Sequence, residues 1–126
     1  MGNRDTGVVG RRAESLAFEY LRDHGLTPVA RNFRSRGGEI DLIMLDGDCL
    51  AFIEVRSRRS SQFTSPSSTV DPRKQRKLVG TAAMFAARHD RFADFTMRFD
   101  VISIEGTAHP TIRWIRDAFR PDDSAL

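Results

Sequence analysis

Apolar side chains recur along this chain at two different spacings, and these spacings separate helices from strands. From Arg11 to His24 the apolar residues recur every three or four positions, which is the period of one helix face. Gly25 then provides a C-terminal stop for this helix. A second helix is predicted to begin after Asp71, a good N-cap residue, with Pro72 in its first position. Its buried face is expected to hold Leu78, Val79, Ala82, Phe85 and Ala86.

The remaining apolar segments are short and indicate β-strands. Pro28 favours an edge position, or the strand start, for the first of them, because proline cannot donate a backbone hydrogen bond. The expected strands are residues 26–33, 39–43, 52–56, 96–104 and 111–115. The resulting order, α-β-β-β-α-β-β, predicts an α/β fold in which helices flank a small mixed sheet.

The length of 126 residues corresponds to a single domain, residues 1–126, that is large enough for a hydrophobic core. Within it, we expect residues 1–10 to be flexible and residues 121–126 to be frayed. The segment 57–70 is rich in serine and cannot bury enough apolar area to order itself. It is therefore expected to be a mobile loop beside the polar end of the central hairpin.

This hairpin carries acidic residues on both of its strands. Residues i and i+2 of a strand share a face, so Glu39 and Asp41 lie together on the first strand, and Glu54 and Arg56 on the second. The opposite face is apolar, with Ile40, Leu42, Met44, Ala51, Ile53 and Val55. We expect a helix to cover the apolar face, and we expect the acidic face to hold a site suited to a hard divalent cation.

Two different turns are compatible with this arrangement. With Gly47-Asp48 as the turn, Asp41 lies opposite Glu54. With Asp46-Gly47 as the turn, Glu39 lies opposite Glu54 instead. Both registers keep the acids on one face of the hairpin, whereas a slip by one residue would separate them.

The composition excludes several classes of protein. The hydrophobic fraction of 40% and the charged fraction of 29% are those of an ordinary soluble globule. No apolar run approaches the roughly 20 residues that a membrane span requires, and the N-terminal residues lack the apolar core of a signal peptide. Cys49 is the only cysteine, which excludes an intrachain disulfide and a cysteine-rich zinc site. We therefore expect a cytoplasmic protein with no membrane partner.

Positive charge is concentrated around the acidic hairpin, although the net charge is only +3. Residues 31–77 hold 10 of the 20 basic residues against 6 acids, whereas the segments on either side are close to balanced. This distribution would attract a nucleic acid toward the hairpin. Because 18 of the 20 basic residues are arginine, a GC-rich genome is the alternative explanation. The candidate nucleic-acid-binding residues are Arg31, Arg34, Arg58, Arg73, Lys74, Arg76 and Lys77.

Four segments together resemble the YraN family of small bacterial proteins. They are the helix with Glu14, the strings Gly38–Ile43 and Phe52–Arg56, and the basic helix start Lys74–Leu78. The resemblance covers nearly the whole chain. It implies a restriction-endonuclease-like fold and a relationship to the PD-(D/E)xK nucleases, especially to archaeal Holliday-junction resolvases.

The same resemblance implies a site for Mg²⁺, with Mn²⁺ as the alternative. Asp41 and Glu54 match the acids that bind the metal ion in this superfamily, and Glu14 matches the acid that a helix often adds. Arg56 occupies the position of the superfamily's lysine, and Gln75 resembles the helix glutamine of some branches. Mg²⁺ prefers oxygen ligands and usually keeps several waters, so one or two carboxylates suffice.

The arginine at position 56 departs from the superfamily pattern. Arginine has a pKa above about 12 and cannot act as a base, although it can still bind a phosphate. Three functions therefore remain open. They are a metal-dependent endonuclease acting on DNA, a catalytically weak or inactive nucleic-acid-binding module, and a protein that docks a partner through its serine-rich loop and basic helix. A homodimer is expected by analogy with the resolvases alone.

Ordinary structural roles are the alternative for every candidate residue. Asp41 and Glu54 can be a surface acid pair that forms salt bridges with nearby arginines, and Glu39 can do the same. Asp100 fits a partner of a neighbouring arginine better than a metal ligand. Gln75 is expected to point inward, where its amide requires a polar partner.

Overall fold

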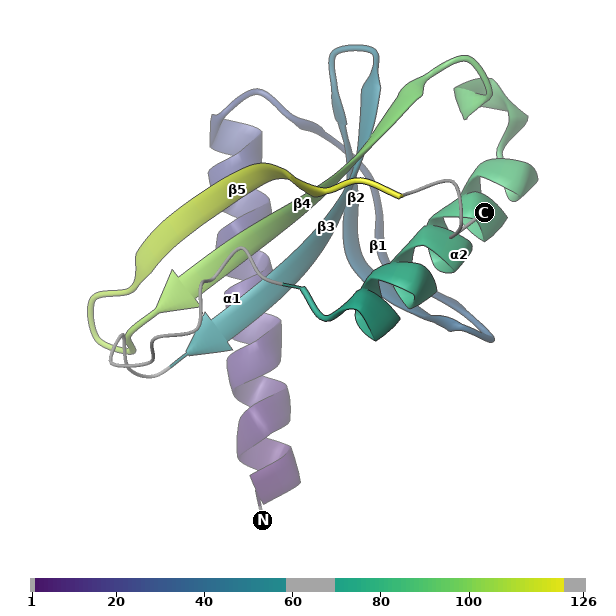
Figure 1. The fold of residues 1–126 in the computed structure, drawn as a ribbon. Coiled ribbons are helices and arrows are strands. Elements are labelled where there is room, and N and C mark those ends of the chain that lie inside the picture. Colours follow the sequence, from purple (N-terminus) through teal and green to yellow (C-terminus); the bar gives the residue numbers. More distant parts are fainter. Residues whose placement is uncertain (1, 59–69, 122–126) are drawn as a thin grey trace.

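The computed structural model describes residues 2–58 and 70–121. Five strands form one sheet in the order β1-β2-β3-β4-β5, in which β3 and β4 are parallel and the other neighbours are antiparallel (Figure 1). The elements in chain order are α1 (Gly2–Asp23), β1 (Thr27–Ser35), β2 (Gly38–Asp46), β3 (Cys49–Arg58), α2 (Pro72–Arg88), a short 3₁₀ helix (Asp90–Phe92), β4 (Thr96–Glu105) and β5 (Thr111–Phe119). The predicted α/β class and element order are confirmed.

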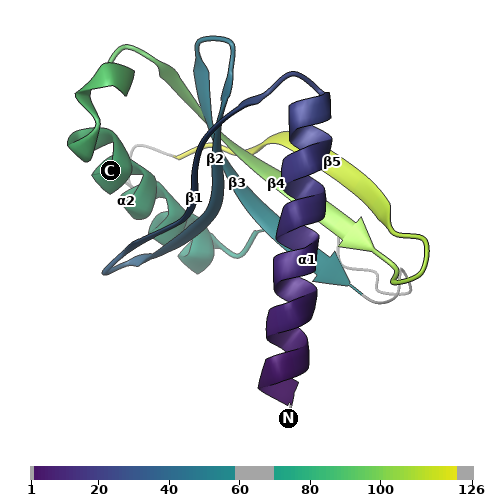
Figure 2. The same ribbon diagram turned by 180° about the vertical axis from the view of Figure 1, so that it is seen from behind.

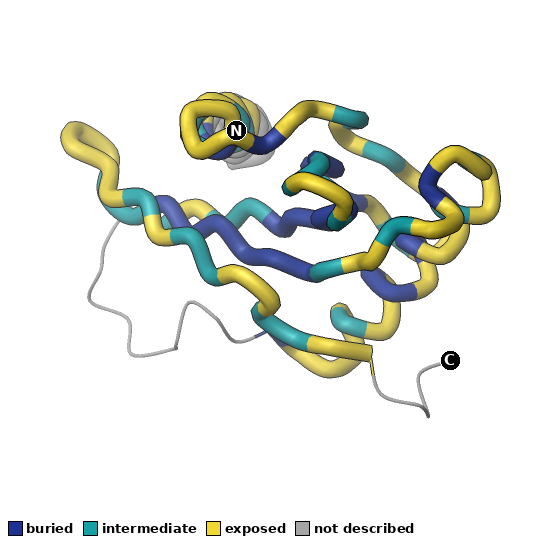
Figure 3. Tube along the Cα trace, turned by 90° about the horizontal axis from the view of Figure 1, so that it is seen from above, coloured by how far each residue is buried: buried dark blue, intermediate teal, exposed yellow. Residues whose placement is uncertain are grey.

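The two long helices cover opposite faces of the sheet. Helix α2 lies on the face toward the viewer in Figure 1, and α1 lies on the other face, which Figure 2 shows from behind. The buried strands lie between the two helices (Figure 3). One core cluster, which includes Leu42, Met44 and Ile53, packs with Ala17 and Leu21 of α1. The other packs against α2 and includes Ile43, Leu50, Phe52, Leu78 and Phe85.

Helix α1 ends as its sequence predicts but begins much earlier. Gly25 adopts a positive φ of 92°, which only glycine tolerates readily, and donates its backbone N–H to Arg22. Leu26 donates to the carbonyl of Leu21 at 3.0 Å, which completes a Schellman motif. Residues 2–10, for which the sequence analysis expects a flexible segment and no helix, belong to α1. This end of α1 extends past the sheet (Figures 1 and 2).

Helix α2 begins where the sequence predicts. The Asp71 side chain accepts a hydrogen bond of 2.7 Å from the backbone N–H of Arg73, and Pro72 is the first helical residue. Four of the five residues predicted for its buried face are buried, and Ala86 is half-buried. Neither helix, over the residues described, contains a stretch that is long and apolar enough to cross a membrane.

The serine-rich segment is shorter than expected at both ends. Strand β3 continues through Ser57 and Arg58, which pair with Ile104 and Glu105 of β4. Val70 is buried in the core beside α2. The rest of the predicted loop and most of the predicted frayed tail, residues 59–69 and 122–126, lie outside the described residues.

The first of the two predicted hairpin registers is confirmed. The pairs between β2 and β3 run from Asp46 and Cys49 to Leu42 and Ile53, so Gly47-Asp48 is the turn. Continued by one residue, this register places Asp41 opposite Glu54. The expected face of Ile40 is wrong, because this residue packs in the α2 cluster rather than with Leu42. Strict alternation fails here because Ile40 lies outside the part of β2 that pairs with β3, which begins at Leu42.

Candidate functional site

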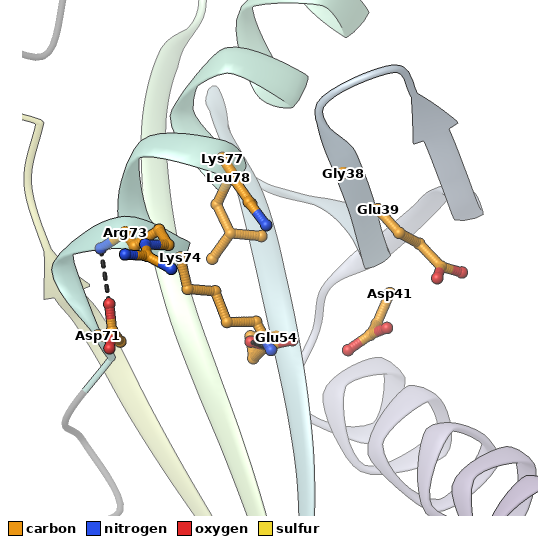
Figure 4. Close-up of a pocket in the computed structure, with 9 residues that line it drawn as sticks. All are labelled: Gly38, Glu39, Asp41, Glu54, Asp71, Arg73, Lys74, Lys77 and Leu78. Atoms are coloured by element: carbon orange, nitrogen blue, oxygen red, sulfur yellow. Dashed lines mark hydrogen bonds and ion pairs between the residues drawn. The ribbon is translucent and has the colours of Figure 1, made fainter.

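A polar pocket opens where β2, β3 and the first turn of α2 meet (Figure 4). Its volume is about 470 Å³, and most of its lining side chains are charged. The lining residues are Gly38, Glu39, Asp41, Glu54, Asp71, Arg73, Lys74, Lys77 and Leu78. The acidic face of the hairpin therefore does form one side of a pocket, and the basic start of α2 forms the other side.

Asp41 lies at the point where β2 and β3 separate. Its Oδ2 accepts a hydrogen bond of 2.8 Å from the backbone N–H of Val55, a donor on the neighbouring strand. The Asp41 side chain thus accepts the hydrogen bond of a β3 backbone N–H just beyond the last backbone pair, Leu42 with Ile53. This single bond fixes the Asp41 carboxyl group beside Glu54, which is the neighbour of Val55 in sequence.

Burial raises the pKa of Asp41 from its ordinary value of 3.8 to about 7. The hydrogen bond from Val55 acts in the opposite direction, because it favours the charged carboxylate. The negative charges of Glu54 and Glu14, together with a hydrogen bond between the Asp41 and Glu54 side chains, raise the pKa further. The raised pKa of Asp41 therefore reflects its burial first and the neighbouring acids second.

Glu54 is a buried carboxylate whose protein partners are few. Its side chain is 8% exposed, and its Oε2 lies 2.6 Å from the ammonium nitrogen of Lys74. Figure 4 shows these two side chains in contact, whereas Glu39 points away from them. This contact is an ion pair without hydrogen-bond geometry, and Oε2 accepts no hydrogen bond from the described residues. The ammonium of Lys74 is therefore the main compensation for the burial of this carboxylate oxygen.

These residues fit a hard divalent cation that keeps several of its waters. Asp41 and Glu54 are adjacent, both supply carboxylate oxygens, and the pocket has room for water. The expected third ligand is not in place. Glu14 is half-buried on α1 and acts on Asp41 through its charge, and no three Asp, Glu, His or Cys residues cluster as a metal site among residues 2–58 and 70–121.

Two residues predicted for the catalytic site lie elsewhere. The Nε2 of Gln75 donates a hydrogen bond of 2.7 Å to the carbonyl of Val70, so this glutamine does point inward but braces the start of α2. Arg56 follows Glu54 on β3 and is half-buried, but it does not line the pocket. The strand position that the sequence analysis aligned with a nuclease lysine therefore does not line the pocket.

The predicted nucleic-acid-binding residues fall into two groups. Arg73, Lys74 and Lys77 line the pocket, and Arg34 pairs at 3.4 Å with Glu39 at its edge. Arg76 is exposed on α2, the same helix. The other two lie apart from this pocket. Arg31 stacks over the ring of Phe18 on α1, and Arg58 lines a smaller hollow together with Arg12 of α1.

The pairing of Lys74 with Glu54 was missed by the sequence analysis, which assigned Lys74 to nucleic-acid binding alone. A signal was present in the first turn of α2, which contains basic residues and no acid. The positive end of the helix dipole normally favours acidic side chains there. A basic first turn therefore indicates a nearby anionic partner, which in the folded protein is Glu54.

The sequence was compared with protein families and with curated proteins. The profile of "Uncharacterised protein family UPF0102" matches residues 13–104. A UPF0102 protein of Xanthomonas campestris pv. campestris is 47% identical over 114 residues, which is 90% of this chain and 93% of that protein. One from Stutzerimonas stutzeri is 45% identical over 111 residues, covering 87% and 92% of the two chains. This chain therefore belongs to the bacterial family UPF0102, the YraN family that its motifs resemble.

Proposed function

We propose that this protein is a metal-dependent nuclease that hydrolyses phosphodiester bonds in DNA. The observation that carries the proposal is the adjacent pair of carboxylates in the pocket, half-buried Asp41 and buried Glu54, of which Glu54 has an oxygen that accepts no hydrogen bond from the described residues. Structural carboxylates are normally satisfied, so this pair supports a binding role for the pocket. The basic side chains on the opposite wall support a polyanionic substrate.

The chemistry follows from the roles of the individual side chains. A bound Mg²⁺ or Mn²⁺ supplies Lewis acidity toward the phosphoryl oxygen and acidifies a water molecule. Asp41 and Glu54 would hold the ion, and the hydrogen bond from Val55 fixes the orientation of the Asp41 carboxylate. Arg73 and Lys77 would bind phosphate groups on the wall formed by α2. Glu14 would stabilise the bound cation through its negative charge without touching it.

A binding module without efficient cleavage is the second candidate function. The specific observation in its favour is the departure at Arg56, which leaves the strand without the usual lysine of the superfamily. In this alternative, the basic wall of the pocket binds nucleic acid, and binding is unaffected by EDTA or by Asp41→Asn.

A cleavage assay with purified protein separates the two candidates. Labelled single-stranded, duplex, flap and four-way-junction DNA, together with RNA, would be incubated with Mg²⁺, Mn²⁺ or EDTA. Asp41→Asn is the test variant, and Asp48→Asn is the matched control because Asp48 is exposed at the tip of the same hairpin. The nuclease proposal expects metal-dependent cleavage that is lost with Asp41→Asn and retained with Asp48→Asn.

Two other outcomes would count against the nuclease. Salt-sensitive binding of these substrates with no cleavage under any metal condition would favour the binding module. Cleavage that persists at the wild-type rate in Asp41→Asn would place the chemistry elsewhere or in a contaminant. Absence of both cleavage and binding would exclude both candidate functions for these substrates.

A further inference from the structure

Lys74 is the cation that contacts the buried carboxylate of the pocket. It is the third residue of α2, its side chain is 52% exposed, and its ammonium reaches inward to the 8% exposed Glu54. Lys77 lies one helical turn later and lines the same pocket, but the described residues include no salt bridge to it. The two lysines therefore share a pocket and a helix but differ in their contact with the acidic pair.

The position of Lys74 in its own helix is unfavourable in the absence of an anion. The first turn of α2 holds Arg73 and Lys74 beside the positive end of the helix dipole. The ion pair with Glu54 offsets this repulsion, while Asp41 beside it accepts a backbone hydrogen bond and has no salt bridge among the described residues. One monovalent ammonium thus leaves the pair of carboxylates incompletely neutralised, whereas a divalent cation shared by both would neutralise them more fully.

We infer that Lys74 occupies the cation position at Glu54 in the metal-free protein and is displaced from it when a divalent cation binds. The released ammonium stays in the same pocket, where it supplies to a substrate phosphate the compact positive charge that strand position 56 does not provide. This inference rests on the proposed function, because it assumes that Asp41 and Glu54 bind metal.

The two lysines give a matched experiment that does not depend on activity. Binding of Mn²⁺ would be measured by the EPR signal of the unbound ion for the wild type, Lys74→Met, Lys77→Met and Asp41→Asn, at one pH and ionic strength. Methionine keeps the aliphatic stem of the lysine and removes its charge. We expect Lys74→Met to bind Mn²⁺ about tenfold more tightly than the wild type, because a competing cation has been removed. Lys77→Met should change the affinity by less than about threefold, because screening weakens a charge without direct contact.

The outcomes distinguish a failure of this inference from a failure of the proposed function. If the wild type binds no Mn²⁺, or if Asp41→Asn binds it equally well, the metal site itself is wrong and both proposals fall. If the wild type binds through Asp41 but Lys74→Met binds equally or more weakly, only the displacement of Lys74 is wrong. Equal tightening in both methionine variants would show a general charge effect, which also overturns it. Circular dichroism and Lys74→Gln guard against misfolding of a single variant.

A second measurement tests the role of the released ammonium. Single-stranded DNA would be titrated into the Ca²⁺-loaded protein, and binding would be followed by fluorescence anisotropy. Lys74→Met should weaken DNA binding by about threefold to tenfold, even though it tightens metal binding. Opposite signs in the two assays are the signature of a residue that exchanges a carboxylate for a phosphate. Unchanged DNA affinity would remove the second half of the inference.

Discussion

Two neighbouring strands of this sheet each bury a carboxylate, and the protein treats the two groups in opposite ways. Asp100 on β4 has a fully buried side chain and accepts two hydrogen bonds from Arg98, at 2.8 and 2.9 Å. It also accepts one from the indole of Trp114 at 3.1 Å and one from the backbone N–H of Asp117 at 2.9 Å. Glu54 on the adjacent parallel strand β3 has one ion pair and a buried oxygen that accepts no hydrogen bond from the described residues.

The backbone around Asp100 is shaped to satisfy it. The pairing between β4 and β5 shifts at this residue, and Asp117 opposite it adopts a positive φ of 53°. This bulge directs the N–H of Asp117 at the buried carboxylate. Among residues 2–58 and 70–121, no backbone N–H donates to the buried oxygen of Glu54 in this way. This fold can therefore satisfy a buried acid completely, and the incomplete satisfaction of Glu54 is the difference on which the proposed binding role rests.

The largest expected effect is on the Asp100 side of this comparison. Asp100→Ala removes two hydrogen bonds of Arg98, whose side chain is only 18% exposed and which keeps, among the described residues, only its contact with Asp46 at 3.1 Å. It also leaves the indole N–H of Trp114 without its acceptor. We expect the free energy of unfolding to fall by about 3–5 kcal/mol. Urea denaturation would measure it, with Asp94→Ala as an exposed control that should change stability by less than about 0.5 kcal/mol. A loss of similar size in both variants would contradict a structural role for Asp100.

Asp41→Asn should have the opposite sign. Because its pKa is raised in the folded state, Asp41 binds its proton more tightly when folded, and stability from this group is lost as pH rises from about 4 to about 7. In metal-free buffer near pH 8 the amide should raise the free energy of unfolding by about 1–3 kcal/mol, and near pH 4 the gain should vanish. Urea denaturation at both pH values measures the difference. A variant less stable than the wild type near pH 8 would place Asp41 with Asp100 as a structural acid.

Metal ions should stabilise the folded protein through the pocket that contains Asp41 and Glu54, and not through Asp100. At Mg²⁺ concentrations about ten times the dissociation constant, binding to the folded state adds about 1.4 kcal/mol. For a chain of this size the melting temperature should then rise by a few degrees, roughly 2–8 °C. A thermal melt series in Mg²⁺ and in EDTA would detect this rise in the wild type and its loss in Asp41→Asn. A rise that survives in Asp41→Asn would indicate a different ion site.

The smallest expected effect tests whether Gln75 belongs to the metal site or only stabilises the start of α2. Gln75→Ala removes the hydrogen bond to the carbonyl of Val70 and should lower the free energy of unfolding by about 1 kcal/mol. Mn²⁺ affinity should stay within about twofold of the wild type, because this amide does not line the pocket. Denaturation and EPR titration of the same preparation provide both values. A large loss of metal affinity with unchanged stability would return Gln75 to the site.

The predictions that were confirmed rest on signals between residues that are close together in the sequence. Gly25, Asp71 and Pro72 end and start helices through their own backbone conformations, so these boundaries are local and were predicted correctly. The alternation along the central hairpin placed Asp41 and Glu54 together for the same reason. Asp100 was also identified as a partner of a nearby arginine, and Arg98 lies two residues away on the same strand.

The sequence by itself determined the element order, the hairpin and the pairing of two acids on it, because these depend on periods of two and 3.6 residues along the chain. Tertiary structure decided which turn formed and on which side Ile40 packs. It also decided that the lysine at the site comes from α2, where Lys74 meets Glu54 across 20 residues of sequence. The periodicity of the sequence does not predict this contact, because the contact depends on the angle at which α2 packs on the sheet.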